Sequence, residues 1–370
     1  MKSEAGPARS RLPIAALLSV ALLLISDHLV LGPGGPWPFI TAQVPLGDGV
    51  SKGVARDRVQ LQMSRARPAE EKSVFVVGTS RARAGFQRRF AMEVASSLSF
   101  FGLTHAMLDP FVTLSLAPEI VEAGADVVVL YLSDFDTHRP LRIDPIPAKS
   151  SNSPHALVEV FANAGPAFAF ENRTLLYRIT VSSWLHSYRF RDLLAQTPLS
   201  ALRAFPLPRR LVERSQPTAR GPAVLESPFA NSLSEVERAR FVARLPTELK
   251  RHAVRQLPFL TEIQKGEHSR IGMGIVRRTV TVFRDSGVEV LIVECPLHES
   301  RGWLRDAGTR PEFLSLGRSL AEQEGVHFLP LEALPNFQSG DFSDLLHLNQ
   351  KGANRLTAAL VTALEEIATN

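Results

Sequence analysis

A serine stands where a predicted strand gives way to a predicted helix. Residues 74–77 read Val-Phe-Val-Val, an apolar and largely β-branched run that predicts a buried strand. Gly78 permits a sharp exit from this strand, and residues 81–96 have the composition of one helix. Ser80 then lies at a helix N-terminus, where backbone N–H groups and the helix dipole favour negative charge. This position suits a nucleophile and the oxyanion that it generates; the alternative is a serine that only caps the helix.

A histidine and an aspartate near the C-terminus are of the types that activate a serine. Asp344 stands three residues before His347, ahead of a predicted terminal helix. An imidazole is the usual base for a serine hydroxyl at neutral pH, and a carboxylate fixes its tautomer and stabilises the imidazolium. The spacing allows both side chains to turn toward one point. The alternatives are a surface loop for Asp344 and His347, and a helix N-cap for Asn349.

Size and charge limit the class of protein. The chain has 370 residues, of which 45% are hydrophobic, so it can bury one large core with an insertion or two smaller cores. The 42 basic and 37 acidic residues give a net charge of +5, with both signs interspersed. No basic stripe is interleaved with aromatic residues, so we expect no nucleic-acid partner.

The sequence has few residues that could form a disulfide or bind a metal ion. Cys295 is the single cysteine, which excludes an intrachain disulfide and a cysteine-based metal cluster. His298 follows a predicted strand, but no second and third ligand stand at metal-binding spacing. We therefore expect neither a metal nor another cofactor.

The N-terminus has the pattern of a membrane anchor. Residues 1–11 are polar and basic, and residues 12–32 hold an apolar run that reaches spanning length when it is extended past Asp27 and His28. No good cleavage site follows, which favours a transmembrane anchor over a cleaved signal segment, and the Pro/Gly run directly after the apolar segment argues against a core helix. Because the basic residues precede the run, residues 1–11 are placed in the cytoplasm and the rest outside. Residues 33–72, rich in Gly, Pro and charge, predict a tether.

From residue 73 to residue 370, predicted strands alternate with predicted helices. The helices include residues 110–123, 312–323 and 350–367, and the strands are residues 73–77, 98–103, 125–132, 288–295 and 326–331. Apolar strands separated by helices predict an α/β domain with a mostly parallel sheet covered on both faces. Ligands of such sheets bind beyond the carboxyl ends of the strands, where Ser80 falls.

Residues of about 137–280 interrupt this alternation and predict an inserted helical lobe. A helix over residues 175–195 carries several aromatic residues, for which core packing is favoured over contact with lipid or substrate. A further helical stretch begins at Ser234, whose spacing to Glu237 fits a capping box.

Two segments resemble those of the SGNH/GDSL hydrolases. They are Gly-Thr-Ser80-Arg-Ala after the first strand, and Asp344-x-x-His347-Leu-Asn with a glycine before the last helix. The chain is most similar to the membrane-anchored branch of that family, which acts on O-acyl groups of cell-envelope polymers such as alginate or teichoic acid. The resemblance covers about residues 73–135 and 286–366, and it implies a flavodoxin-like three-layer α/β/α fold.

The resemblance implies a role for each residue of the two segments. Ser80 is the nucleophile, His347 the general base and Asp344 its orienting partner. An acyl-enzyme then forms on Ser80, and hydrolysis and transfer differ in whether water or a sugar hydroxyl resolves it. We also expect Arg81, Asp134 and Asn349 to bind substrate. For Arg81, charge balance or a solvent-facing helix position are alternatives to holding an anionic polymer.

The sequence departs from the family at the expected oxyanion hole. The Ser80 N–H supplies one donor. The second family block offers a glycine N–H, where this chain has His105 with Gly102 nearby. The third block presents an asparagine side chain, where this chain has Ser133, which can donate, and Asp134, which would repel an oxyanion when ionised. Losing one such donor lowers the rate by about 100- to 1000-fold.

The resemblance implies an extracytoplasmic, membrane-tethered serine esterase or O-acyltransferase. Its substrate would be an acyl ester, an acetyl ester above all, of a cell-envelope or secreted glycan, or a small ester. Its other partners would be the membrane, through residues 12–32, and a membrane protein that donates acyl groups. The departures at the oxyanion hole keep a second hypothesis open, a membrane-anchored SGNH-fold binding or assembly protein with little or no catalysis.

Overall fold

The computed structural model describes residues 11–31, 60–68, 70–104, 110–138, 142–143, 223–224, 267–298 and 309–369, with the single positions 243, 247 and 250. The chain divides into two compact units. Of the described elements, the first unit holds helix α1 (Arg11–Leu31) and the second holds all the others. The aromatic helix predicted over residues 175–195 and the capping box predicted at Ser234 lie outside the described residues.

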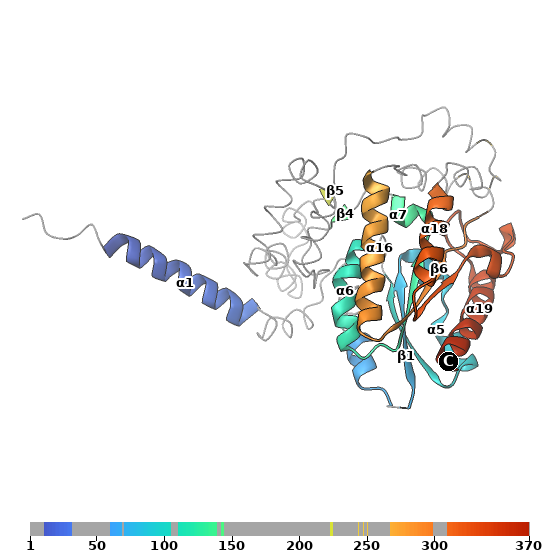
Figure 1. The fold of residues 1–370 in the computed structure, drawn as a ribbon, viewed down its shortest axis with the longest axis horizontal. Helices are drawn as coiled ribbons and strands as arrows, with labels where there is room; N and C mark the ends of the chain where they lie inside the picture. The colour runs from blue at the N-terminus through green and yellow to red at the C-terminus, as the bar shows by residue number, and fades with distance from the viewer. Residues whose placement is uncertain are drawn as a thin grey trace, which may run out of the picture. The chain divides into compact units, whose positions relative to one another are not determined.

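A five-stranded parallel sheet forms the centre of the second unit (Figure 1). Its strands follow the order β2-β1-β3-β6-β7, and each neighbouring pair is parallel. In chain order they are β1 (Lys72–Gly78), β2 (Leu98–Thr104), β3 (Val127–Leu132), β6 (Glu289–Glu294) and β7 (Val326–Leu329). This is a doubly wound order whose direction reverses between β1 and β3. The predicted α/β class with a mostly parallel sheet is confirmed.

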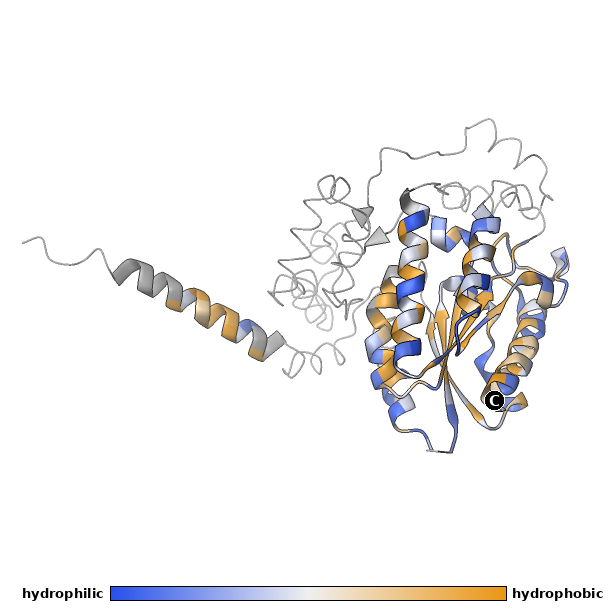
Figure 2. Cartoon of the chain, viewed as in Figure 1, coloured by the Kyte–Doolittle hydropathy of each residue, from blue (hydrophilic) through white to orange (hydrophobic). Residues whose placement is uncertain are grey.

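The central strands form where the sequence is apolar on both faces. Every residue of β3 is buried, and in β1 only Lys72 is exposed. Successive side chains of a strand point to opposite faces, so a strand that is buried throughout must be covered on both sides. Figure 2 shows the resulting apolar sheet between helices that carry polar residues on their outer sides.

Helices cover both faces of this sheet. On one face α6 (Pro110–Glu122) packs against α16 (Glu267–Asp285), and α18 (Thr309–Ala321) lies over β7. The other face is covered by α4 (Ser80–Gly85), α5 (Arg88–Val94) and α19 (Gln350–Thr369). The shorter elements are α7 (Asp134–His138), β4 (Arg142–Ile143), β5 (Ala223–Val224), η3 (Leu331–Ala333) and η4 (Ser339–Asp341).

The single helix predicted over residues 81–96 is wrong, because the chain forms two short helices there, α4 and α5. The break lies where the backbone N–H of Gln87 donates to the hydroxyl of Thr357 at 2.9 Å, and that hydroxyl donates to the carbonyl of Gly85 at 3.4 Å. Helix α19 therefore supplies hydrogen bonds that replace those of a continuous helix.

The edges of the α/β domain also differ from the prediction. Residues 60–65, within the predicted tether, form a helix, and the Ser64 hydroxyl of this helix donates to the carbonyl of Ala123 at 3.0 Å. Helix α16 begins inside the range predicted as an inserted lobe, yet it lies directly against β6 of the sheet. The α/β domain thus includes residues from the predicted tether and from the predicted lobe.

Helix α1 is apolar over much of its length. Its described side chains include the exposed Leu22, Leu23 and Leu29. Among the residues that the structure describes, no helix is long and apolar enough to cross a membrane.

Candidate functional site

The turn after β1 presents Ser80 at the carboxyl edge of the sheet. A Cβ atom on Gly78 would come within 2.7 Å of the Cβ atoms of both Ala82 and Tyr131, so only glycine allows the turn to pack this closely on β3. Thr79 is the N-cap of α4, and its hydroxyl accepts a hydrogen bond from the Arg81 N–H at 3.2 Å. The capping role that was the alternative for Ser80 is thus filled by Thr79, and the Ser80 hydroxyl serves another contact.

The loop that carries His347 is closed at its base and anchored to α19. Phe342 and Leu348 form an antiparallel bridge, and between them the Ser343 N–H donates to the carbonyl of His347 at 2.9 Å. Gly352 is required beneath this loop, because a Cβ atom there would lie 2.3 Å from the carbonyl oxygen of Asp341. A short bridged loop that packs on the buried face of α19 holds His347 in a defined place.

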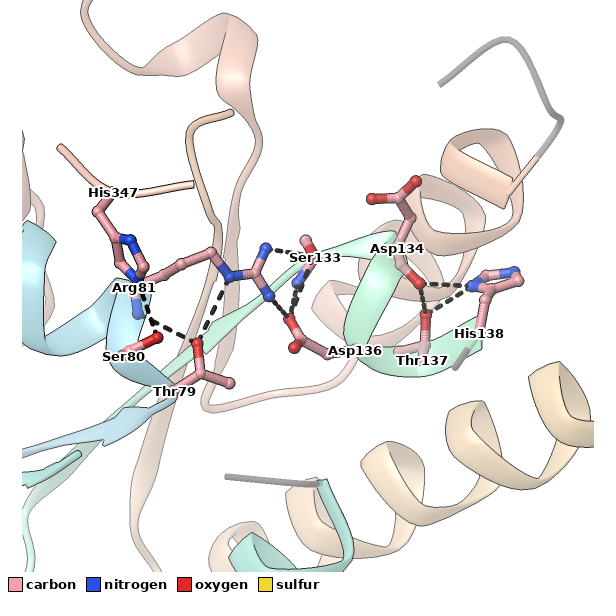
Figure 3. Close-up of polar contacts among 9 residues, drawn as sticks. All are labelled: Thr79, Ser80, Arg81, Ser133, Asp134, Asp136, Thr137, His138 and His347. Atoms are coloured by element: carbon pink, nitrogen blue, oxygen red, sulfur yellow. Dashed lines mark hydrogen bonds and ion pairs between the residues drawn. The ribbon is translucent and has the colours of Figure 1, made fainter. Parts of the chain in front are cut away.

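Ser80, His347 and Asp344 form a continuous hydrogen-bonded chain. The Nε2 atom of His347 lies 2.9 Å from Ser80 Oγ, although the two residues are 267 positions apart in the sequence (Figure 3). The Nδ1 atom of His347 lies 2.8 Å from Asp344 Oδ2 and 3.0 Å from Oδ1. All three residues are partly exposed. The structure thus brings together the three residues predicted to carry the chemistry.

Asp344 is fixed as a carboxylate by its own loop. Its Oδ1 atom accepts the backbone N–H groups of Leu346 at 2.7 Å and of His347 at 2.8 Å. Burial raises the pKa of Asp344, but the hydrogen bonds from the His347 ring and these two N–H groups outweigh burial and lower the pKa to about 2. An ionised Asp344 can only accept a hydrogen bond, so the Nδ1 atom of His347 carries the proton and donates to it. The Nε2 atom of His347 is then unprotonated and accepts the hydrogen bond of the Ser80 hydroxyl.

The end of β3 holds Ser133 and Asp134, and the side chains of both are occupied by the protein. The Ser133 hydroxyl donates to Asp136 Oδ2 at 3.1 Å, and the Ser133 N–H donates to the same oxygen at 2.8 Å. The Asp134 carboxylate accepts the Thr309 hydroxyl at 2.9 Å, at the start of α18. Both residues are buried. In this arrangement the proton of the Ser133 hydroxyl lies in the hydrogen bond to Asp136, and the Asp134 carboxylate faces the start of α18.

Arg81 points inward and forms a buried ion pair. Its guanidinium donates to Asp136 Oδ2 and to Ser133 Oγ, the latter at 2.8 Å. Burial alone would lower the pKa of Arg81, but the charge and hydrogen bond of Asp136 raise it above its ordinary value. Of the alternatives for Arg81, the structure shows charge balance, with Asp136 as the partner; the side chain is neither solvent-facing nor exposed to a polymer.

Three further residues were predicted to belong to the site. The N–H of Gly102 donates to Gln60 Oε1 at 3.3 Å, and Gly102 pairs with Val76 within the sheet, two residues before the end of β2. The Asn349 side chain accepts the N–H of Gly352 at 3.1 Å and donates to the carbonyl of Gly340 at 2.7 Å, so it caps α19. His105 lies outside the described residues.

Two residues of the site were missed by sequence reasoning. Thr79 was not assigned the cap of α4, although it directly precedes the serine. Asp136 was not recognised as the partner of Arg81. The available signal was a pair of opposite charges that follow two buried strands, Arg81 after β1 and Asp136 after β3. Because β1 and β3 are neighbours in a parallel sheet, residues just beyond their carboxyl ends lie close together.

The described residues contain no cluster of three or more His, Cys, Asp and Glu side chains that could hold a metal ion. His298, the histidine considered for such a role, is buried with its ring edge-on to Phe342 at 5.4 Å between centroids.

Comparison with known proteins gives no family for this chain. The sequence matches no protein-family model, and no curated protein is significantly similar to it. The chemistry of Ser80, His347 and Asp344 is therefore argued from their geometry.

Proposed function

We propose that the protein is a serine esterase or O-acyltransferase that works through an acyl-enzyme on Ser80. The observation that carries this proposal is the chain of contacts from Ser80 Oγ to His347 Nε2 at 2.9 Å and from His347 Nδ1 to Asp344 Oδ2 at 2.8 Å. This is the arrangement of nucleophile, base and orienting carboxylate that acyl transfer requires. It lies at the reversal of strand order between β1 and β3, where doubly wound sheets bind their ligands.

The proposed reaction has two halves. The Ser80 oxygen attacks the acyl carbon of an ester while its proton moves to His347 Nε2, and Asp344 stabilises the resulting imidazolium. The ester C–O bond then breaks, and the leaving alcohol takes the proton from Nε2. In the second half, water or a sugar hydroxyl gives its proton to His347 Nε2 and attacks the acyl carbon. The bond between this carbon and Ser80 Oγ then breaks, Oγ takes the proton back from Nε2, and an acid or a new ester is released.

The oxyanion of this reaction has one well-placed donor among the described residues. The N–H of Ser80 belongs to the first residue of α4, and N–H groups at this position have no partner within their helix. Ser133 supplies no second donor while its hydroxyl is directed to Asp136. Since one donor is worth about 100- to 1000-fold in rate, a site with the Ser80 N–H as its single donor would turn over slowly.

The proposed substrate class and location follow from the resemblance to the membrane-anchored SGNH branch. We propose acyl esters, acetyl esters above all, of a cell-envelope or secreted glycan, with the α/β domain on the extracytoplasmic side. Helix α1 supports a membrane tether, because its described leucines are exposed and exposed apolar clusters mark contact surfaces. An acyl-donating membrane protein is the partner expected for the transferase form.

A second candidate is a membrane-anchored binding or assembly protein with the same fold and little catalysis. The observation that favours it is the occupied side chain of Ser133, which stands where the SGNH/GDSL hydrolases that the sequence resembles present an oxyanion donor. The two candidates differ in whether Ser80 reacts.

Turnover of p-nitrophenyl acetate and reaction with a fluorophosphonate probe test the proposal. Wild-type protein should turn over the ester and take up the probe, and Ser80→Ala should do neither. Ser286→Ala is the matched control, because Ser286 is an exposed serine whose hydroxyl donates to the carbonyl of Val282 in α16. A folded wild-type protein that shows neither activity would overturn the enzyme in favour of the binding protein.

A further inference from the structure

Arg81 and Asp136 form an ion pair that is buried beside the nucleophile turn. The Arg81 side chain is 6% exposed and that of Asp136 is 1% exposed. Removing two charges from water is costly, and apolar residues of similar volume often stabilise a fold as well as or better than a buried pair. A contribution to the stability of the fold is thus a weak explanation for this pair. Its position beside the Ser80 turn suggests a role in the site instead.

The hydrogen bonds of the pair involve the residues directly before and after Ser80 and the end of the neighbouring strand β3 (Figure 3). Arg81 Nε donates to the Thr79 hydroxyl at 3.4 Å, so the residues before and after Ser80 are tied to each other. Arg81 Nη1 donates to Ser133 Oγ at 2.8 Å, while Asp136 Oδ2 accepts the Ser133 N–H at 2.8 Å. The turn that carries Ser80 is thereby joined to the carboxyl end of β3.

Three hydrogen bonds of this network meet at one oxygen of Asp136. Oδ2 accepts the Arg81 guanidinium, the Ser133 N–H and the Ser133 hydroxyl. Oδ1 is buried and has no hydrogen-bond partner among the described residues. Because these hydrogen bonds share one oxygen atom, a shift of the Ser80 turn would strain several of them at once. The shared oxygen therefore restricts the turn to one position relative to β3.

From this geometry we infer that Arg81 and Asp136 are positioning residues, which hold the Ser80 hydroxyl in line with His347 Nε2. The inference rests on the proposed function of Ser80. The opposite charges of the pair cancel, so the ionised Asp136 adds no net negative charge beside the oxyanion that forms on attack. Neither residue is assigned a contact with substrate.

The test uses the full-length chain with ¹⁵N-labelled histidine. The ring ¹⁵N shifts of His347, assigned with His347→Gln, report its bond to Ser80, and Ser80→Ala gives their value when that bond is absent. Asp136→Asn, which keeps the shape of Asp136, and Arg81→Met should move the shifts toward the Ser80→Ala value. Arg67→Met should not, because Arg67 pairs with Asp126 at the opposite, amino end of β3, at 2.9 Å. Wild-type shifts in both variants would overturn the inference.

The rate of fluorophosphonate labelling gives the second readout. Arg81→Met and Asp136→Asn should each lower it by about 100-fold, as expected for a misplacement of roughly 1 Å. Arg81→Met/Asp136→Leu should regain thermal stability without regaining the rate, because the apolar pair packs but does not tie Thr79 to Ser133. A rate that falls in one single variant and rises in the other would show a purely electrostatic role and overturn positioning.

These readouts separate the two claims. A wild-type protein that does not label, but whose His347 shifts move in Asp136→Asn, would contradict the proposed function and support the positioning role. A protein that labels at wild-type rate in both single variants, with unchanged shifts, would support the proposed function and contradict the positioning role.

Discussion

Asp344 is the residue whose ionisation the fold controls most directly. Its loop holds the pKa at about 2, with hydrogen bonds from His347 and Leu346 that exceed the effect of burial. An aspartate in an unfolded chain has a pKa of about 3.9. Above about pH 5 the group is ionised in both states, so its contribution to stability is fully present. As the pH falls toward 2 the unfolded state takes up the proton first, and the contribution is lost.

We therefore expect the free energy of unfolding to fall by about 2 kcal/mol between pH 4 and pH 2 because of Asp344. Urea denaturation of wild-type protein and Asp344→Asn across this range isolates the effect, since the variant lacks the titrating group. Asp285→Asn, at an exposed aspartate of α16, controls for general charge effects. Parallel pH profiles for wild-type protein and Asp344→Asn would show that this carboxylate is not stabilised by the fold.

The same substitution should nearly abolish catalysis. Asp344→Asn presents an amide to His347 Nδ1, which favours the tautomer with the proton on Nε2 and removes the base from Ser80. A loss of about 10⁴-fold in kcat is expected for this change in a triad, with KM much less affected. Steady-state turnover of p-nitrophenyl acetate measures it. A variant with more than a tenth of the wild-type kcat would mean that Asp344 does not orient the base.

The sequence predicted the meeting of Ser80, His347 and Asp344 better than the contacts that support it. Ser80, His347 and Asp344 are each marked by local pattern, a serine after an apolar strand and an Asp-x-x-His ahead of a helix. The pairing of Arg81 with Asp136 and the binding of Gln60 to Gly102 join segments far apart in the chain. Residue types allow many such pairings, and only the packed fold selects among them.

Helix α16 shows how one element positions another near the site. A Cβ atom on Gly272 would lie 2.2 Å from the carbonyl oxygen of Thr137 in α7, so the backbones of the two helices are in direct contact there. Gly274 lies two residues further along α16, where a Cβ atom would meet no other atom within 4 Å. Since α7 carries Asp136, the close approach at Gly272 fixes the element that contacts the Ser80 turn through Arg81.

The two glycines give a matched pair of substitutions. Gly272→Ala should lower the free energy of unfolding by about 1–3 kcal/mol, because α7 must move away to make room. Gly274→Ala should raise it by up to about 1 kcal/mol, because alanine is the better helix former and its space is open. Urea denaturation at neutral pH compares them. Equal effects of the two substitutions would contradict the close packing of α16 on α7.

Strands and helices differ in how much of them the sequence predicts. The five parallel strands and α19 follow from apolar runs and from a stripe of buried leucines, Leu356, Leu360 and Leu364, which are local properties. The break between α4 and α5 was missed because its hydrogen bonds come from Thr357 in α19. The extension of the domain to residues 60–68 was missed because Gly- and Pro-rich surroundings mask a short helix.

The protein as a whole is proposed to be a membrane-tethered catalyst that faces away from the cytoplasm. An alkaline phosphatase fusion after residue 72 should be active, because the basic residues 1–11 favour a cytoplasmic N-terminus and so place residue 72 outside the cytoplasm. Alkaline phosphatase folds to its active form only outside the cytoplasm. A fusion that lacks residues 1–32 is the control and should be inactive. An active enzyme in both fusions, or in neither, would contradict the proposed tether.

The most direct test of the proposed chemistry is to locate the fluorophosphonate adduct by peptide mass spectrometry. Full-length protein should carry one adduct, on the peptide that contains Ser80, and the adduct should be lost in Ser80→Ala and strongly reduced in His347→Gln. Each result follows from the 2.9 Å contact between Ser80 Oγ and His347 Nε2. An adduct on another residue, or an adduct on Ser80 that forms equally fast without His347, would contradict a nucleophile activated by this histidine.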